Sequence, residues 1–427
     1  MIHPDTTAFL DGLQKTGIRP GLSRIRRLLA RLAHPERAFP AVLITGTNGK
    51  GSTAAFLEAM LRASGLRTGL FTSPHLVDVR ERIRIDGALV SPERFDACSA
   101  DVRQAMAGGP GERAIQATYF EALTAIGYLA FARENVDFAV VEVGMGGRLD
   151  STNVIAPLVS VLTNVSLDHQ HFLGDTVDAI AVEKIGVARR GRPLVTAVDA
   201  ALFARALAPL LRRRGVPALR LGHDFLLRRS GRRIDWQGRA ALTDLVLGLP
   251  GAFQIDNAAL ALATVEALAD HGIRVDATAI RAGLAAASWP GRIQVVAGTP
   301  MVVLDGCHNP GAAARLAETL DEGLLPRPRV LVHATKPEKD FGGVLDLLAP
   351  RCDAVIETSA PGLADPMDVL PRAVAAARPG TPVVALDDLA EAVRRARALA
   401  GPTGSVLIAG SLYLVGAALA RRPWEDT

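Results

Sequence analysis

The stretch TGTNGKGST, residues 45–53, decides how this chain begins to fold. The apolar run 41–44 precedes it, and a helical hydrophobic pattern that stops near Gly65 follows it. A glycine-rich turn between a buried strand and a helix directs backbone N–H groups and the helix N-terminus at phosphate oxygens. The stretch therefore predicts a strand, a phosphate-binding loop and a helix, with Lys50 neutralising the outer phosphates.

The loop differs from the common G-x-x-x-x-G-K-[ST] pattern. Ile44 stands in the place of the first glycine, and Gly51 separates Lys50 from the hydroxyls of Ser52 and Thr53. These differences weaken an interpretation as a GTPase or kinase. The alternative is a glycine turn that only connects strand to helix, which the lysine and the two hydroxyls at the helix start disfavour.

The composition is typical of a folded enzyme with two or three domains. Of 427 residues, 49% are hydrophobic and 22% charged, and the 48 Lys plus Arg and 44 Asp plus Glu form no long block of like charge. A nucleic-acid partner is therefore weakly supported. Three dispersed cysteines disfavour zinc and disulfides. The sequence has no secretion signal and no run of about 18 apolar residues, so we expect a cytoplasmic protein without membrane contact.

Short valine-rich runs predict the remaining strands. In the first part of the chain these runs are 68–71, 138–143, 159–165 and 194–198. Alternating short segments within 220–249 predict a small antiparallel insertion. After WPGR, residues 289–292, a second series follows at 301–305, 330–333, 354–357, 383–386 and 406–409.

These runs predict an α/β protein with two domains. Residues 1–289 would form an N-terminal P-loop-type domain with a mostly parallel sheet and the small antiparallel insertion. Residues 290–427 would form a smaller, Rossmann-like α/β domain. The boundary carries an error of several residues.

Polar side chains follow several of the predicted strands. Glu142 ends one strand, Asp168 and His169 follow the next, and Ser73 lies in the loop after strand 68–71, which we expect to be polar as far as residue 87. The carboxyl ends of parallel strands meet at one edge of a sheet, where open α/β folds place ligands. Ser73, Glu142 and His169 could therefore share one Mg²⁺ with ATP phosphates. The alternative for His169 is a local hydrogen bond.

Lysine is rare, and nearly all the basic side chains of the chain are arginine. The five lysines are Lys15, Lys50, Lys184, Lys336 and Lys339. Unlike arginine, a lysine can lose its proton and act as a nucleophile. Lys184 lies on a predicted helix, where an ordinary surface lysine is the alternative. In the second domain, Asp305, His308 and Asn309 end a strand, and turn formation is the alternative to ligand binding.

Nine short strings occur in an order that resembles the folylpolyglutamate synthase and dihydrofolate synthase family, which belongs with the Mur-type amino-acid ligases. The strings are TGTNGKGST, FTSPHL, TYFE, EVGMGGRLDSTN, LDH, EKIG, WPGR, DGCHNP and GSLY, and the resemblance as a whole runs from Gly21 to about Tyr413. The resemblance implies a central-type ATP-binding domain, a C-terminal glutamate-ligase domain, and ATP-dependent addition of L-glutamate to folates. Within this resemblance, the string TYFE indicates that dihydropteroate is also a substrate. The reaction would pass through an acyl phosphate and release ADP and phosphate.

The resemblance also implies a set of site residues. Catalysis would use Lys50, Glu142, His169 and Lys184. ATP would contact Gly49, Lys50, Gly51, Ser52, Asn257, Arg292 and Asp305. Two Mg²⁺ ions would be held by Ser73, Glu142, His169 and Lys184, the last as a carbamate. The other substrates would contact Ser73, Pro74, His75, Thr118, Tyr119, Phe120, Glu121, Leu149, Asp150, Ser151, His308 and Ser411.

Two departures from the family pattern stand in the second domain: Cys307 replaces the usual alanine, and HATKPEKDF, residues 333–341, is an irregular loop. We expect neither to abolish activity. Another Mur-type ligase is an alternative, although the 44 residues before Thr45 are too few for a nucleotide-sugar domain. A P-loop switch that binds nucleotide without ligation is a second alternative. The expected partners are small molecules, and the expected state is a monomer.

Overall fold

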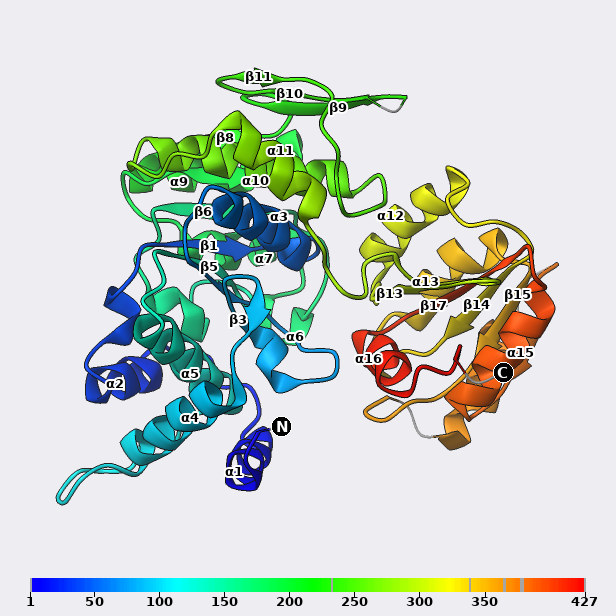
Figure 1. Ribbon diagram of the computed structural model, residues 1–427, viewed down its shortest axis with the longest axis horizontal. Coiled ribbons are helices and arrows are strands. Elements are labelled where there is room, and N and C mark those ends of the chain that lie inside the picture. Colours follow the sequence, from blue (N-terminus) through cyan, green and yellow to red (C-terminus); the bar gives the residue numbers. More distant parts are fainter. Residues whose placement is uncertain (1, 232, 338, 364–365, 377–379, 426–427) are drawn as a thin grey trace. The chain divides into compact units, whose positions relative to one another are not determined.

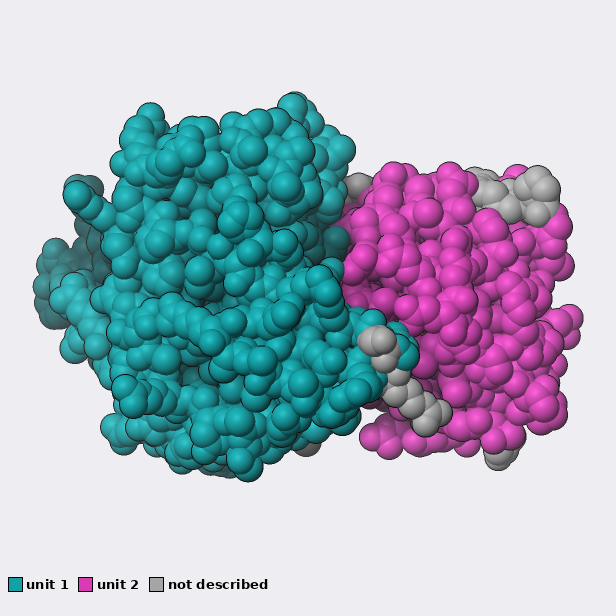
Figure 2. Space-filling model, turned by 90° about the horizontal axis from the view of Figure 1, so that it is seen from above, with its two compact units in different colours: residues 1–74, 80–248, 255–287 teal, residues 75–79, 249–254, 288–427 magenta. Residues whose placement is uncertain are grey.

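The computed structural model describes residues 2–231, 233–337, 339–363, 366–376 and 380–425. The chain forms two compact units, coloured separately in Figure 2. Unit 1 comprises residues 1–74, 80–248 and 255–287, and unit 2 comprises residues 75–79, 249–254 and 288–427. Two short segments from the earlier part of the chain therefore belong to unit 2.

The main sheet of unit 1 has the strand order β4-β3-β2-β5-β1-β6-β7-β8. Its central strand β1 (Ala41–Thr45) is buried at every residue and pairs in parallel with β5 (Phe138–Glu142) and β6 (Val159–Leu162). The other parallel strands are β2 (Thr68–Phe71), β7 (Leu194–Thr196) and β8 (Ala218–Arg220). The predicted mostly parallel sheet is confirmed.

One part of this sheet was not predicted. Residues that we expected in a polar loop form β3 (Ile83–Ile85), antiparallel to β2, and β4 (Ala88–Leu89). The strand forms because Ile83 is fully buried opposite Phe71, and this pairing with β2 outweighs the polar local composition.

The helices of unit 1 include α3 (Lys50–Ala63), which begins at the phosphate loop and is buried along residues 51–61. Gly283 on α11 (Ala277–Ala286) lies so close to α3 that a Cβ there would come 2.4 Å from the Met60 Cα. The remaining helices are α1 (Pro4–Gln14), α2 (Ser23–Arg31), α4 (Pro92–Ala107), α5 (Tyr119–Arg133), α6 (Gln170–Leu173), α7 (Val177–Lys184), α8 (Ala200–Leu202), α9 (Ala208–Arg214) and α10 (Gln254–Ala269).

The predicted antiparallel insertion is confirmed as a small sheet, seen apart from the main sheet in Figure 1. It consists of β9 (Leu226–Ser230), β10 (Arg233–Gln237) and β11 (Ala241–Leu242). Trp236 attaches it to α10, since its indole N–H donates to Glu266 Oε1 over 2.9 Å.

Unit 2 contains a sheet of order β12-β13-β17-β14-β15-β16. The parallel strands are β13 (Met301–Asp305), β14 (Arg329–His333), β15 (Ala354–Glu357), β16 (Val383–Ala385) and β17 (Ser405–Ala409), as predicted. An antiparallel edge strand, β12 (Gln294–Gly298), was not predicted. Its apolar run, residues 295–297, is only three residues long, which is shorter than the runs that indicate a strand.

Helices cover both faces of this sheet. Val303, Leu331 and Leu407 form one core with α12 (Pro310–Asp321) and α13 (Phe341–Leu348). Their neighbours Val302, Val330 and Val406 form another with α15 (Leu389–Ala400) and α16 (Leu412–Arg421), and α14 (Val369–Ala376) completes the unit. This alternation follows from the two-residue period of a strand. Within the described part of the chain, no helix is long and apolar enough to cross a membrane.

Candidate active site

The phosphate loop, residues 46–49, joins β1 to α3. Gly46 passes so close to β6 that a Cβ would lie 1.8 Å from Thr163 Oγ1. Gly49 has φ +83°, and a Cβ there would lie 2.3 Å from Asn257 Oδ1. The close approaches require glycine at both positions, and the positive φ adds a second reason at Gly49. Asn257, predicted from FQIDNAA, therefore lies against the loop.

The end of β6 holds the loop by hydrogen bonds that the sequence did not predict. Asn164 Oδ1 accepts from Asn48 N over 3.0 Å, and Asn164 Nδ2 donates to Asn48 O over 3.0 Å. Thr163 Oγ1 donates to the same carbonyl over 2.6 Å. The two side chains therefore hold the loop in place. Their only sequence signal is their place at the end of a buried strand, VSVLTN.

Two lysine side chains meet at one backbone oxygen of the loop. Gly46 O accepts from Lys184 Nζ over 2.8 Å and from Lys50 Nζ over 3.1 Å. Lys184 ends α7 and is only 4% exposed, so it is not the ordinary surface lysine of the alternative reading. Burial, together with the Lys50 charge, lowers the pKa of Lys184 to about 7, although Asp168 and Asp150 act in the opposite direction.

Glu142 lies at the end of β5, beside β1 in the sheet. It is 4% exposed, and its Oε2 accepts from Ser73 N over 3.1 Å. The turn after Glu142 also reaches β1, because Thr45 Oγ1 donates to Gly146 O over 2.5 Å. The structure thus brings Ser73 to Glu142, and brings the glutamate's own turn to the strand that carries the phosphate loop.

His169 has a left-handed backbone (φ 51°) at the start of α6. Its side chain is 45% exposed, and its Nε2 lies 3.9 Å from Asp168 Oδ1, too far for a hydrogen bond, whereas its backbone N donates to the same oxygen over 2.9 Å. Among the residues that the structure describes, no group of three His, Cys, Asp or Glu side chains is arranged to hold a metal ion. The predicted metal ligands include only two residues of these types, so their shared metal stays a prediction.

Asp150, a predicted substrate contact, is buried within its own loop. Its oxygens accept from Met145 N over 2.9 Å, Thr152 N over 3.0 Å and Thr152 Oγ1 over 2.6 Å. Burial raises its pKa, and these donors lower it. Asp150 therefore shapes the loop 144–152. Its neighbour Leu149 accepts from Gly21 N through its carbonyl oxygen over 3.3 Å.

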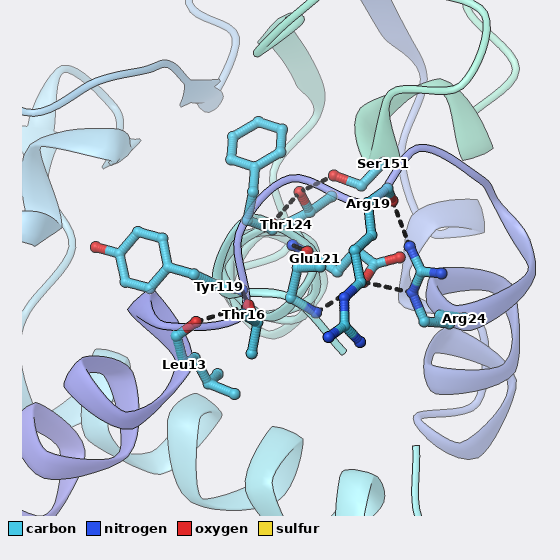
Figure 3. A network of polar contacts seen from close by, with 10 residues as sticks. Leu13, Thr16, Arg19, Arg24, Tyr119, Glu121, Thr124 and Ser151 are labelled. Carbon is cyan, nitrogen blue, oxygen red and sulfur yellow. Dashed lines mark hydrogen bonds and ion pairs between the residues drawn. The ribbon is translucent and has the colours of Figure 1, made fainter. Parts of the chain in front are cut away.

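The predicted contacts at the start of α5 form a polar network, drawn in Figure 3. Thr118 Oγ1 accepts from Glu121 N over 3.2 Å, and Glu121 Oε2 accepts from Thr118 N over 2.7 Å, a reciprocal helix cap. Glu121 Oε2 also accepts from Arg24 Nε over 3.1 Å. Thr124 Oγ1 lies 2.7 Å from Ser151 Oγ, so loop 144–152 is tied to α5. Glu121 is thus engaged in positioning this helix.

The aromatic residues beside this cap are only partly buried. Tyr119 N donates to Thr16 Oγ1 over 3.4 Å, and the Arg82 guanidinium lies 5.8 Å from the Tyr119 ring centre. The Phe120 ring centre lies 6.1 Å from that of Phe71. In the neighbouring loop, Pro74 is exposed and belongs to unit 1, whereas His75 is half-buried and belongs to unit 2.

In unit 2, Asp305 is 3% exposed at the end of β13. Its Oδ2 accepts from Ile293 N over 3.0 Å and its Oδ1 from Cys307 N over 2.9 Å. Burial raises its pKa, and the Arg292 charge opposes this. His308 Nδ1 lies 3.0 Å from Gly306 O.

Two further side chains of unit 2 begin helices. Asn309 Oδ1 accepts from Ala312 N over 2.8 Å, and Ser411 Oγ accepts from Tyr413 N over 3.1 Å. The turn chemistry that we considered for the strand end is therefore present at Asn309. Ser411, a predicted substrate contact, is buried.

Two family models match this chain. The model for the Mur ligase middle domain matches residues 44–265, and the model for the Mur ligase, glutamate ligase domain matches residues 291–412. Together the two matches include both the phosphate loop of unit 1 and the parallel sheet of unit 2.

Individual relatives extend these matches over nearly the whole chain. It is 35% identical to the folylpolyglutamate synthase of Lacticaseibacillus casei, over 98% of each chain. It is 38% identical to a probable bifunctional folylpolyglutamate synthase/dihydropteroate synthase of Haloferax volcanii, over 99% of this chain and 51% of that protein. This chain thus spans about half the length of the second relative.

A solved structure matches the fold. It is the bifunctional folylpolyglutamate synthase/dihydrofolate synthase of Yersinia pestis, complexed with AMPPNP and a manganese ion. The TM-score is 0.85 at 32% identity, and 97% of each chain is covered.

Proposed function

This chain belongs to the folylpolyglutamate synthase and dihydrofolate synthase family of Mur ligases, and we propose that it joins L-glutamate to folates, and also to dihydropteroate, with cleavage of ATP to ADP and phosphate. The observation that carries the proposal is the convergence of Lys50 and Lys184 on the Gly46 carbonyl. Two cations beside a preformed glycine loop and a helix N-terminus suit a triphosphate.

The chemistry requires an activated carboxylate, because a carboxylate is a poor acyl donor at neutral pH. Its oxygen attacks the γ-phosphorus of ATP, the bond to the β-γ bridging oxygen breaks, and ADP leaves. The neutral amine of glutamate then attacks the acyl carbon, the amine proton is lost to solvent, and phosphate leaves. Lys50 would neutralise charge on the phosphoryl oxygens during the first step.

We propose that Ser73, Glu142 and His169 hold a divalent cation. Glu142 fits this role because its buried carboxylate already faces Ser73 at the strand edge. A bound Mg²⁺ would supply charge neutralisation and Lewis acidity to the phosphoryl group. The manganese complex of the Yersinia pestis relative supports a divalent ion in this family.

Lys184 would act as a carbamate. Its pKa of about 7 leaves a neutral amine available near neutral pH. The amine nitrogen adds to the carbon of CO₂, a proton is released, and the new carboxylate can hold a second cation. This modification replaces the buried cation with an anion, so it also removes the repulsion from Lys50.

The remaining predicted contacts are proposed on the family resemblance and on their positions within each unit. Asn257 would contact ATP from beside Gly49, and Arg292 and Asp305 would contact it from unit 2. The pterin-bearing substrate would lie along the loop with Ser73, Pro74 and His75, residues 118–121 and the loop 149–151, and His308 and Ser411 would bind glutamate. We also propose that the protein acts on small molecules as a monomer.

The test is an assay of purified protein with ATP, Mg²⁺, L-glutamate and, separately, dihydropteroate or a reduced folate. We expect one ADP and one phosphate for each amide formed. AMP and pyrophosphate as products would contradict the acyl-phosphate route. ATP hydrolysis that is independent of glutamate, with no amide, would instead identify a nucleotide switch. An amide formed only with another acceptor would identify another Mur-type ligase.

A further inference from the structure

A buried pair of ionisable side chains lies at the carboxyl ends of β14 and β15 in unit 2. His333 and Glu357 are opposite each other in the parallel register, and their side chains are 0% and 1% exposed. His333 Nδ1 lies 2.8 Å from Glu357 Oε1, so the ring donates to the carboxylate and is held in one orientation.

The pair is incompletely satisfied. Within the described residues, His333 Nε2 and Glu357 Oε2 are buried without a hydrogen-bond partner, as are the hydroxyls of Thr335 and Thr358. Unpartnered polar atoms inside a core are costly and rare, and an apolar pair would have filled the same space at lower cost. The cluster therefore calls for an explanation other than stability.

The free edge of the His333 ring lies against the backbone of Gly410. A Cβ on Gly410 would come 2.7 Å from His333 Nε2 and 2.6 Å from Ala334 O, and Gly410 has φ +121°. Gly410 N also donates to Cys307 O over 3.1 Å, next to His308. The ring thus supports the turn that leads into Ser411 and α16.

A second contact links the same two segments. Lys336, in the irregular loop after β14, has its Nζ 4.2 Å from the Tyr413 ring centre. Tyr413 is in the first turn of α16, two residues after Ser411. The end of β14 therefore touches the start of α16 both before and after Ser411.

We propose that His333 and Glu357 are positioning residues for the amino-acid substrate, which they serve by fixing the Gly410–Ser411 turn. This inference rests on the proposed function, in which Ser411 and His308 contact glutamate. Glu357 orients the imidazole, the imidazole supports Gly410, and Gly410 places Ser411 and braces the backbone at Cys307. Neither side chain touches the reacting atoms.

The test separates the two ends of the ring. His333→Asn keeps a donor near Glu357 but lacks the edge that reaches Gly410, whereas His333→Gln can reach Gly410 but loses the donor. Glu357→Gln keeps an acceptor for the ring. The double variant His333→Leu/Glu357→Met removes both polar groups, so it avoids an unpaired buried charge and stays folded.

We expect His333→Asn and the double variant to raise the KM for glutamate about tenfold or more, because a small displacement of a binding group is costly. Glu357→Gln should keep the KM for glutamate near the wild-type value, and the KM for ATP should not change in any variant. Ser405→Ala is the matched control, since it removes a part-buried hydrogen bond to Pro326 O at the opposite end of β17. It should leave the KM for glutamate unchanged.

An unchanged KM for glutamate in the folded double variant, with wild-type enzyme active, would overturn the inference alone. An equal loss for ATP, folate and glutamate would overturn it as well, because that result indicates a general structural role. If wild-type protein forms no amide with any acceptor, the proposed function itself fails and the inference with it. Thermal melting of each variant identifies those that have lost the fold.

Discussion

The carboxyl edges of the two parallel sheets carry buried charge in opposite ways. In unit 1, Lys50 and Lys184 both donate to one carbonyl oxygen. Burial and the Lys50 charge lower the pKa of Lys184 by more than the nearby Asp168 and Asp150 raise it. In unit 2, the buried acids Asp305 and Glu357 each have their own donors, from backbone N–H groups and from His333. The first edge is prepared for an incoming polyanion, whereas the acids of the second edge are bound within their own unit and hold backbone in place.

The largest test of this difference is removal of the Lys50 charge. We expect Lys50→Ala to lower kcat about 10²- to 10³-fold, as for the loss of one preorganised group that stabilises a transition state. Steady-state measurement of amide formation checks this. Lys15→Ala, on the exposed end of α1, should retain full activity. A Lys50→Ala enzyme with normal kcat would show that this edge does not act on the phosphoryl group.

Lys184→Arg keeps a cation but cannot lose it. We expect activity to fall at least about 10²-fold, because the loss of a group that only supports a metal ligand already costs about 10- to 100-fold. Lys15→Arg is the matched control. Removal of dissolved CO₂ should lower wild-type activity and should not affect Lys184→Arg. A fully active Lys184→Arg enzyme would rule out the carbamate.

The pH dependence of stability tests the cost of the buried lysine. The folded-state pKa of Lys184 is lowered from 10.5 to about 7, so between these values the unfolded chain binds more protons than the folded protein. The free energy of unfolding of ligand-free protein should therefore rise with pH in this window. The rise should be at most about 1.4 kcal/mol per pH unit.

Urea denaturation at a series of pH values, compared between wild type and Lys184→Met, provides the measurement. The variant should lose this part of the slope, because methionine has no proton to bind. A wild-type free energy that falls from pH 7 to pH 10 by the same amount as in Lys184→Met would contradict the assigned cost.

The smallest expected effect concerns a neutral contact of unit 1. Thr124→Val removes the hydroxyl that meets Ser151 and should raise the KM for the folate substrate about two- to tenfold, the worth of one hydrogen bond. Thr264→Val on α10 is the matched control, since both hydroxyls donate to the carbonyl four residues before but only Thr124 contacts the loop. Equal KM values for the folate substrate in both variants would show that the loop 144–152 does not contribute to folate binding.

The sequence predicted those features that depend on local pattern. The order strand, glycine loop and helix around Lys50 is present, and each valine-rich run that we expected contains a strand. Lys184 was singled out because lysine is rare in this chain, and the structure shows that it is buried. Such features are encoded within a few residues, so periodicity and composition reveal them.

The features that escaped prediction depend on which segments pair with each other, whether these lie near or far apart in the sequence. β3 forms because Ile83 lies opposite Phe71 of β2, and β12 forms a hairpin with β13, with Val296 and Ala297 packed against the core. Asn164 supports the phosphate loop from another strand, and His333 meets Glu357 only through the register of β14 and β15. No local pattern specifies these partners, because they follow from how the sheets assemble.

The contact of Gly283 with Met60 gives the nucleotide-binding helix a remote anchor. A bulkier residue at position 283 would push against the backbone of α3. Backbone cannot move aside as the end of a flexible side chain can, so the helix itself would shift. A shift of the helix as a whole would also displace its N-terminal end, where the phosphate loop joins it. Selections for conditional or temperature-sensitive enzymes should therefore recover lesions at this position, although every atom facing the substrates would keep its chemical identity.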